Sequence, residues 1–185
     1  MNDADCLMLD TNVFNHVLDG QLDPERLRGT RLVATHVQRD EIMATGNEER
    51  RAALMGLFED FVPQRAPTTS AVAGVSMAGE ASASASGVVP TESMVWDVSR
   101  WDEAKWSRED EVFTAMLGEL NALNGGKKNN VKDVLIAETA LRNGWTLVTD
   151  DADLTRVASK YGCRCVNMTV RGGRFSVPPL DRPTG

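Results

Sequence analysis

Cys6-Leu7-Met8-Leu9-Asp10-Thr11-Asn12-Val13 is an apolar run that ends in a carboxylate and two small polar residues. This pattern is typical of a buried parallel strand that delivers its last side chains to the open carboxyl edge of an α/β sheet. An aspartate in a half-buried crevice is costly to hold alone, because its charge has lost part of its hydration. The stretch therefore predicts a sheet edge where Asp10 meets a cation, a hydrogen-bond donor or a proton.

Strand-like and helix-like segments alternate along the rest of the chain, as a parallel α/β sheet requires. Strands are predicted at about 5–10, 32–34, 145–149 and 163–166, and helices at about 13–18, 36–45, 47–62, 107–122, 131–142 and 152–160. We therefore expect an α/β fold, a three-layer sandwich around a central, mostly parallel sheet of four or five strands.

Short capping signals set several helix ends. Thr35 followed by Gln38 fits a capping box, so a helix should start at once after the second strand. Asn130 is predicted to cap the helix that carries Asp133 in its first turn, where the helix dipole favours an ionised carboxylate. Asn143-Gly144 is a good stop for that helix.

Length and composition limit the domain organisation. With 185 residues and 42% hydrophobic content, the chain is predicted to form one domain over about 1–170, with a flexible Ala/Ser/Gly-rich insert at about 64–106 and a tail at 171–185. Three tryptophans lie in that insert, where they pack on the core or stack on bases: Trp96, Trp101 and Trp106. The three cysteines are expected to be buried thiols: Cys6, Cys163 and Cys165.

Charge and hydropathy exclude some classes of function. No apolar run approaches the roughly 18–20 residues that span a bilayer, and the first residues are acidic, so we expect neither a membrane segment nor a secretory signal, and a cytoplasmic location. A net charge of −7 argues against nucleic-acid binding that is driven by overall charge. It leaves open a nuclease whose acidic site is neutralised by metal.

Acidic residues recur at strand ends and helix starts. They are Asp10, Glu41 or Asp40, Asp133, and one or more of Asp150, Asp151 and Asp153. In a parallel sheet these places share the carboxyl edge. Any one of them is more often a helix cap or a solvated surface group, but several converging carboxylates repel unless a cation lies among them. Oxygen ligands without histidine or cysteine favour Mg²⁺ or Mn²⁺ over zinc.

The motifs LMLDTN, Thr-His-x-Gln-x-x-Glu at 35–41, KDVLIAETALRNG and LVTDDADL together resemble those of the PIN-domain ribonucleases, which include the toxins of toxin–antitoxin pairs. The resemblance covers about 5–62 and 107–167. It implies a PIN-like fold and a catalytic set of Asp10, Glu41, Asp133 and Asp151. It implies Asp10, Asp133, Asp151 and Asp153 as metal ligands, with Asp150 as the alternative, and it implies Thr11, Asn12 and Thr149 as positioning groups for water or phosphate.

The resemblance also implies an activity, which is Mg²⁺- or Mn²⁺-assisted hydrolysis of RNA phosphodiester bonds with water as the nucleophile. The partners it implies are an RNA substrate, a cognate antitoxin if the chain is a toxin, and a second copy of the chain in a homodimer. Basic side chains near the site are expected either to meet phosphates or to be solvated: Lys127, Lys128, Lys132 and Arg39.

Two alternatives stay open at this stage. Haloacid-dehalogenase-like phosphatases also use an aspartate at a strand end, a hydroxyl after the second strand, a lysine and a late acidic pair, which Asp10, Thr35, Lys132 and Asp150-Asp151 imitate. They need a second aspartate two residues after the first, where this chain has Asn12. The other alternative is a PIN-like scaffold that binds RNA or protein without catalysis.

Overall fold

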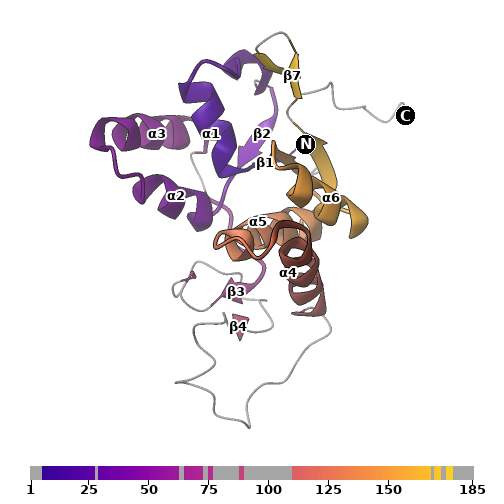
Figure 1. Cartoon of the computed structure of the whole chain (residues 1–185). Helices are drawn as coiled ribbons and strands as arrows, with labels where there is room; N and C mark the ends of the chain where they lie inside the picture. The colour runs from indigo at the N-terminus through magenta and orange to yellow at the C-terminus, as the bar shows by residue number, and fades with distance from the viewer. Residues whose placement is uncertain are drawn as a thin grey trace.

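A four-stranded parallel sheet forms the centre of the computed structural model, which describes residues 6–27, 29–62, 65–72, 75–76, 88–89, 110–167, 169–171 and 174–176 (Figure 1). Its strands lie in the order β2 (Arg31–Val33), β1 (Cys6–Leu9), β5 (Thr146–Thr149) and β6 (Arg164–Asn167). Every neighbouring pair is parallel. The predicted α/β class with a parallel sheet is therefore confirmed.

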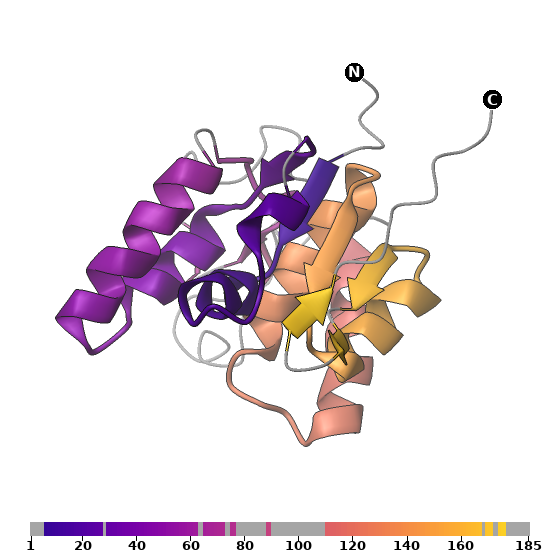
Figure 2. The same ribbon diagram turned by 90° about the horizontal axis from the view of Figure 1, so that it is seen from above.

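Helices cover both faces of this sheet. Figure 2 shows the indigo-to-magenta helices α1 (Thr11–Leu18), α2 (His36–Met43) and α3 (Glu48–Phe61) on one side, and the orange helices α4 (Asp110–Asn124), α5 (Asn130–Arg142) and α6 (Ala152–Lys160) on the other. A short 3₁₀ helix, η2 (Pro24–Leu27), precedes β2. The result is the expected three-layer sandwich.

Alternate side chains of the central strands supply the two halves of the core. Leu7 and Leu9 of β1 pack with Phe14, on the side of α1 to α3. Met8, between them in the sequence, packs on the opposite side with Phe113 and Leu135 of α4 and α5. A strand buried on both faces reads as a continuous apolar run, which explains the sequence of β1.

The predicted capping box at Thr35 is present, and it also fixes the place of α2. The Thr35 hydroxyl accepts a hydrogen bond from the backbone N–H of Val37 at 3.1 Å, and Gln38 Oε1 accepts one from the Thr35 N–H at 2.9 Å. The Gln38 amide then donates to the carbonyl of Leu9 at 2.9 Å. The start of α2 is thereby tied to the end of β1, beside Asp10.

The start of α5 differs from the prediction. Asn129, rather than Asn130, is the capping residue, and its side chain makes no capping hydrogen bond. Asn130 is 1% exposed and its amide donates to Asn121 and Asn124 of α4, at 2.7 and 2.8 Å. Burial against α4 therefore outweighs the intrinsic capping preference of Asn130. The predicted end of α5 is confirmed, because Gly144 has a φ of +66° directly after Asn143.

Two smaller sheets lie outside the sandwich. β3 (Ala71–Val72) pairs in parallel with β4 (Val88–Val89), within the predicted insert. β7 (Thr169–Arg171) and β8 (Arg174–Ser176) form an antiparallel pair, and β8 lies within the predicted tail. The three tryptophans of the insert and its Ala/Ser-rich run at 81–87 lie outside the described residues.

The structure matches the cysteine prediction in part. Cys6 and Cys163 are buried free thiols, as expected, whereas Cys165 is partly exposed. Within the described ranges, no helix is both long enough and apolar enough to cross a membrane.

Candidate functional site

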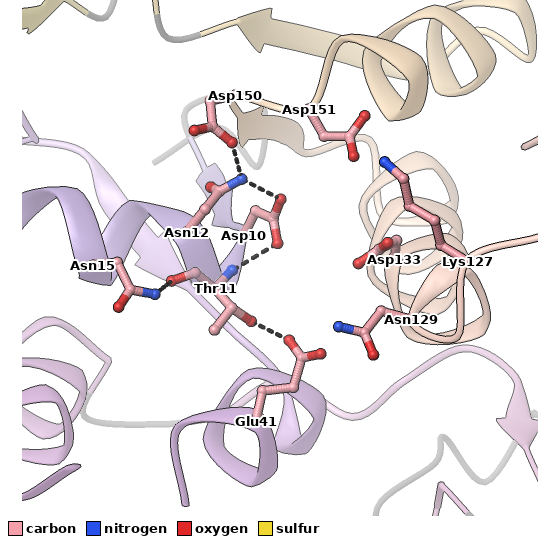
Figure 3. A pocket seen from close by; sticks show the side chains of 10 residues that line it. All are labelled: Asp10, Thr11, Asn12, Asn15, Glu41, Lys127, Asn129, Asp133, Asp150 and Asp151. Carbon is pink, nitrogen blue, oxygen red and sulfur yellow. Dashed lines mark hydrogen bonds between the residues drawn. The ribbon is translucent and has the colours of Figure 1, made fainter. Parts of the chain in front are cut away.

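A polar pocket of about 500 Å³ opens at the carboxyl edge of the sheet (Figure 3). The ten residues that line it are Asp10, Thr11, Asn12, Asn15, Glu41, Lys127, Asn129, Asp133, Asp150 and Asp151. Asp10 follows β1, the pair Asp150-Asp151 follows β5, Glu41 comes from α2, and Asp133 comes from the first turn of α5. The structure thus brings together, in one place, acids that are up to 141 residues apart in sequence.

Asp10 is the most tightly held of these acids. It is 6% exposed, and its carboxylate accepts hydrogen bonds from the Thr11 N–H at 2.7 Å, the Thr149 hydroxyl at 2.6 Å and the Asn12 amide at 3.0 Å. Burial raises the pKa of Asp10 to about 6, although the hydrogen bonds from Thr149 and Thr11 act in the opposite direction. Asp10 is therefore fixed in orientation but is not supplied with a compensating positive charge.

Asp133 lies across the pocket from Asp10 and is more strongly perturbed. Burial raises its pKa to about 8, and the neighbouring charges of Asp10, Glu41 and Asp151 add to the effect, against an opposing influence of Lys127. The start of α5 by itself would favour the ionised form, but burial and the neighbouring acids raise the pKa overall. Loss of hydration and repulsion by three acids outweigh one helix terminus.

Glu41 is held by two groups from other elements. Its Oε2 accepts a hydrogen bond from the Thr11 hydroxyl at 2.5 Å, and Lys132 Nζ lies 3.7 Å from its Oε1. Asp40, the neighbour considered in its place, instead forms an ion pair with Arg39 at 2.7 Å. The structure therefore places Glu41, and not Asp40, in the pocket.

The acids after β5 have separate environments. Asp151 caps α6, because its Oδ1 accepts from the Leu154 N–H at 2.8 Å, and its carboxylate points into the pocket (Figure 3). Asp150 lines the pocket edge, and its two oxygens are bonded by Asn12 and by His16. Asp153, in the first turn of α6, does not line the pocket.

Of the other residues that were predicted for the site, some lie at the pocket and some do not. Thr149 is fully buried and joins the site through its hydroxyl, which donates to Asp10 at 2.6 Å and accepts from the Asp151 N–H at 3.1 Å and from the Asn12 amide at 3.4 Å. Lys127 lines the pocket opposite Asp10, and Lys132 reaches it through Glu41. Lys128 is exposed and is not part of the pocket wall.

Sequence reasoning missed Asn15, Asn129 and His16. Asn15 follows Thr11 by one helical turn, so the helix spacing of α1 was a usable signal for it. Its amide donates to the Thr11 carbonyl at 3.3 Å, and its Oδ1 accepts from Arg50 at 2.8 Å. No motif marks His16 in the sequence.

The chemistry of the pocket suits a hard divalent cation. Its acidic groups offer only oxygen, which Mg²⁺ and Mn²⁺ prefer, and a cation would relieve the repulsion that raises the pKa of Asp133. Among the residues that the structure describes, no three His, Cys, Asp or Glu side chains already stand close enough together to hold a metal. The oxygen donors are of the kind that Mg²⁺ or Mn²⁺ would take, but within the described residues they are not gathered into a ready-made coordination site.

No protein-family model and no curated protein matches the sequence. Similar solved structures include VapBC2 from Rickettsia felis bound to a DNA fragment from its promoter, at 15% identity and a TM-score of 0.43 over 88% of this chain and 98% of that chain. FitAcB from Neisseria gonorrhoeae is similar at 16% identity and a TM-score of 0.44, over 87% of this chain and 96% of that chain. VapBC-5 from Mycobacterium tuberculosis, a member of the VapBC family of toxin–antitoxin systems, is similar at 17% identity and a TM-score of 0.41, over 90% of this chain and 99% of that chain. Each is a distant likeness that spans most of both chains.

Proposed function

We propose that this chain is a divalent-metal-dependent ribonuclease that hydrolyses RNA phosphodiester bonds, as do the PIN-domain ribonucleases that its motifs resemble. The observation that carries the proposal is the convergence of Asp10, Glu41, Asp133 and Asp151 from four elements on one open pocket. An acidic pocket repels a polyanion, so binding of RNA there requires cations between the carboxylates and the phosphate.

Each acid has a separate task in this proposal. Asp10, Asp133 and Asp151 offer the oxygens that would hold Mg²⁺ or Mn²⁺, which when bound supplies water activation and charge stabilisation at the phosphate. Asp10 is oriented in advance by its three hydrogen bonds. Glu41, held by Thr11 and Lys132, is placed to orient the attacking water or to accept its proton.

The basic groups at the pocket supply the positive charge that faces RNA. Lys127 lies in the pocket wall, and Lys132 stands beside Glu41 with a side chain that is 32% exposed. Both can contact backbone phosphates that flank the scissile bond. Arg39 is paired with Asp40, so it is a weaker candidate for this role.

The phosphatase alternative is less compatible with the geometry. A covalent mechanism of this class needs a second aspartate two residues after the first, and Asn12 occupies that place. The Asn12 amide donates to Asp10 at 3.0 Å, so it orients the carboxylate and offers no proton-accepting carboxylate of its own.

The test uses the purified full chain with labelled single-stranded and structured RNAs, in Mn²⁺, in Mg²⁺ and in EDTA. Cleavage is expected with either metal and not in EDTA. Asp10→Asn should reduce it by more than the ~10–100-fold that loss of a supporting residue costs. Asp23→Asn, an exposed aspartate remote from the pocket, is the matched control.

Three results would contradict the proposal. Undiminished cleavage by Asp10→Asn would show that the activity does not come from this site. Hydrolysis of p-nitrophenyl phosphate without RNA cleavage would favour the phosphatase. Tight RNA binding with no cleavage under any metal would favour the non-catalytic scaffold.

The resemblance to toxin members extends the proposal to a cognate antitoxin protein. If the chain is a toxin, a small neighbouring reading frame should encode a protein that co-purifies with it and inhibits cleavage. Light scattering of the chain alone would then test whether it forms the homodimer that the resemblance implies. An uninhibited chain with no such neighbour would leave RNA processing as its role.

A further inference from the structure

His16 lies outside the pocket wall but is anchored on both sides. Its Nε2 is 2.6 Å from Asp150 Oδ2, and its Nδ1 is 2.6 Å from Gln21 Oε1. Its backbone carbonyl accepts from the N–H groups of Gln21 and Leu22 at 2.8 and 3.0 Å. The ring is therefore held between the turn after α1 and the segment that follows β5.

Asp150 connects His16 to Asn12 through its two carboxylate oxygens. The oxygen of Asp150 that does not face His16 accepts a hydrogen bond from the Asn12 amide nitrogen. The same nitrogen donates to Asp10 Oδ2 at 3.0 Å. An amide nitrogen has two hydrogens, so Asn12 can serve both carboxylates, and the Thr149 hydroxyl is a third, longer acceptor at 3.4 Å.

The orientation of the Asn12 amide depends on these three acceptors, of which Asp10 and Asp150 are charged. Asn12 Oδ1 is buried and forms no hydrogen bond with the described part of the chain, so nothing on its carbonyl side fixes the group. The flipped amide would place that oxygen against the carboxylates of Asp10 and Asp150. Displacement of Asp150 would therefore remove one of the acceptors that hold Asn12 and weaken the bond from Asn12 to Asp10, which is one of the three hydrogen bonds that orient that carboxylate.

We propose that His16 is a positioning residue, which fixes the metal-binding carboxylate of Asp10 through Asp150 and Asn12. The inference rests on the proposed function in that Asp10 is taken to bind the cation. His16 does not line the pocket and touches no reacting atom, so its role is to position and not to catalyse. Both oxygens of Asp150 are engaged in this chain of contacts, so Asp150 links His16 to Asn12.

The test measures Mn²⁺ affinity of the purified full chain, by calorimetry or by electron paramagnetic resonance, so that it does not depend on cleavage. His16→Ala should weaken Mn²⁺ binding by about 10-fold, at the lower end of the 10–100-fold effect of supporting residues. It should lower kcat for RNA with little change in KM. His16→Gln, which keeps a donor for Asp150, should restore most of the affinity.

A double-mutant cycle tests whether His16 acts on Asp10 through Asp150. If His16 acts through Asp150, then His16→Ala combined with Asp150→Ala should bind Mn²⁺ no more weakly than Asp150→Ala alone. Asp60→Asn is the matched control, because Asp60 is an exposed aspartate of α3 that does not line the pocket. If His16→Ala does not fold, the comparison of Asp150→Asn with wild type tests the same contact.

The outcomes separate this inference from the proposed function. A folded His16→Ala that binds Mn²⁺ like wild type would overturn the positioning role and leave the nuclease proposal intact. Additive losses from His16→Ala and Asp150→Ala would overturn the route through Asp150. A wild-type chain that neither binds Mn²⁺ nor cleaves RNA would remove both proposals.

Discussion

Replacing Asp133 with asparagine should stabilise the metal-free protein and weaken its response to Mn²⁺. Asp133 faces Asp10, Glu41 and Asp151, and burial together with these charges raises its pKa from 3.8 to about 8. The folded protein therefore holds the Asp133 proton more tightly than the unfolded chain does. Stability consequently falls as pH rises from about 4 to about 8, and the asparagine variant avoids this loss.

The magnitude follows from the pKa difference. At pH 8, a pKa raised from 3.8 to about 8 corresponds to a ceiling of about 5 kcal/mol in unfolding free energy. Asp133 is partly rather than fully buried, so solvent screening reduces this value, and we expect a gain of about 1–3 kcal/mol. For a chain of this length that is a rise in Tm of about 2–10 °C. At pH 5 the gain in unfolding free energy should be about a third of its value at pH 8.

Thermal unfolding in EDTA, followed by circular dichroism at pH 5 and pH 8, measures this effect. Asp23→Asn, which removes an exposed charge outside the pocket, is the control and should leave Tm unchanged at both pH values. Added Mn²⁺ should then raise the Tm of wild type more than that of Asp133→Asn. An unchanged or lowered Tm for Asp133→Asn at pH 8 would show that the pocket acids do not repel one another as described.

Further predictions address metal binding, folding and RNA contact. Because protons compete for Asp10 and Asp133, whose pKa values are about 6 and about 8, Mn²⁺ affinity measured by calorimetry should rise between pH 5.5 and 8.5, and a flat profile would contradict the site. Thr35→Ala removes the capping box and should cost about 1–2 kcal/mol in urea unfolding, whereas an unchanged midpoint would mean that α2 does not depend on its cap. Lys127→Gln should raise KM for RNA and reduce the slope of log affinity against log salt concentration by about 1. The same slope in the variant and in wild type would exclude a phosphate contact of Lys127.

Local signals in the sequence were sufficient for most of the fold. The run from Cys6 to Asp10, the Thr35 and Gln38 pair and the Asn143-Gly144 stop each act through neighbours within a few residues, so the sequence shows them directly. The start of α5 was misjudged because burial of Asn130 against α4 is a contact between elements. The β7–β8 pair was missed for the same kind of reason, since its Gly-rich connection was read as a tail.

The sequence by itself determined that Asp10 ends a buried strand and that other acids stand at equivalent ends of the sheet, because strand periodicity and helix caps are local properties. Tertiary structure alone decided that Glu41 enters the pocket and Asp40 does not, and that both Asp150 and Asp151 line it. Glu41 and Asp40 are adjacent on α2, and only the packing of that helix against Thr11 and Lys132 selects Glu41. The same holds for the contact of His16 with Asp150, which joins residues that are 134 apart in sequence. The raised pKa values also arise only on folding, because they require burial and the approach of like charges from separate elements.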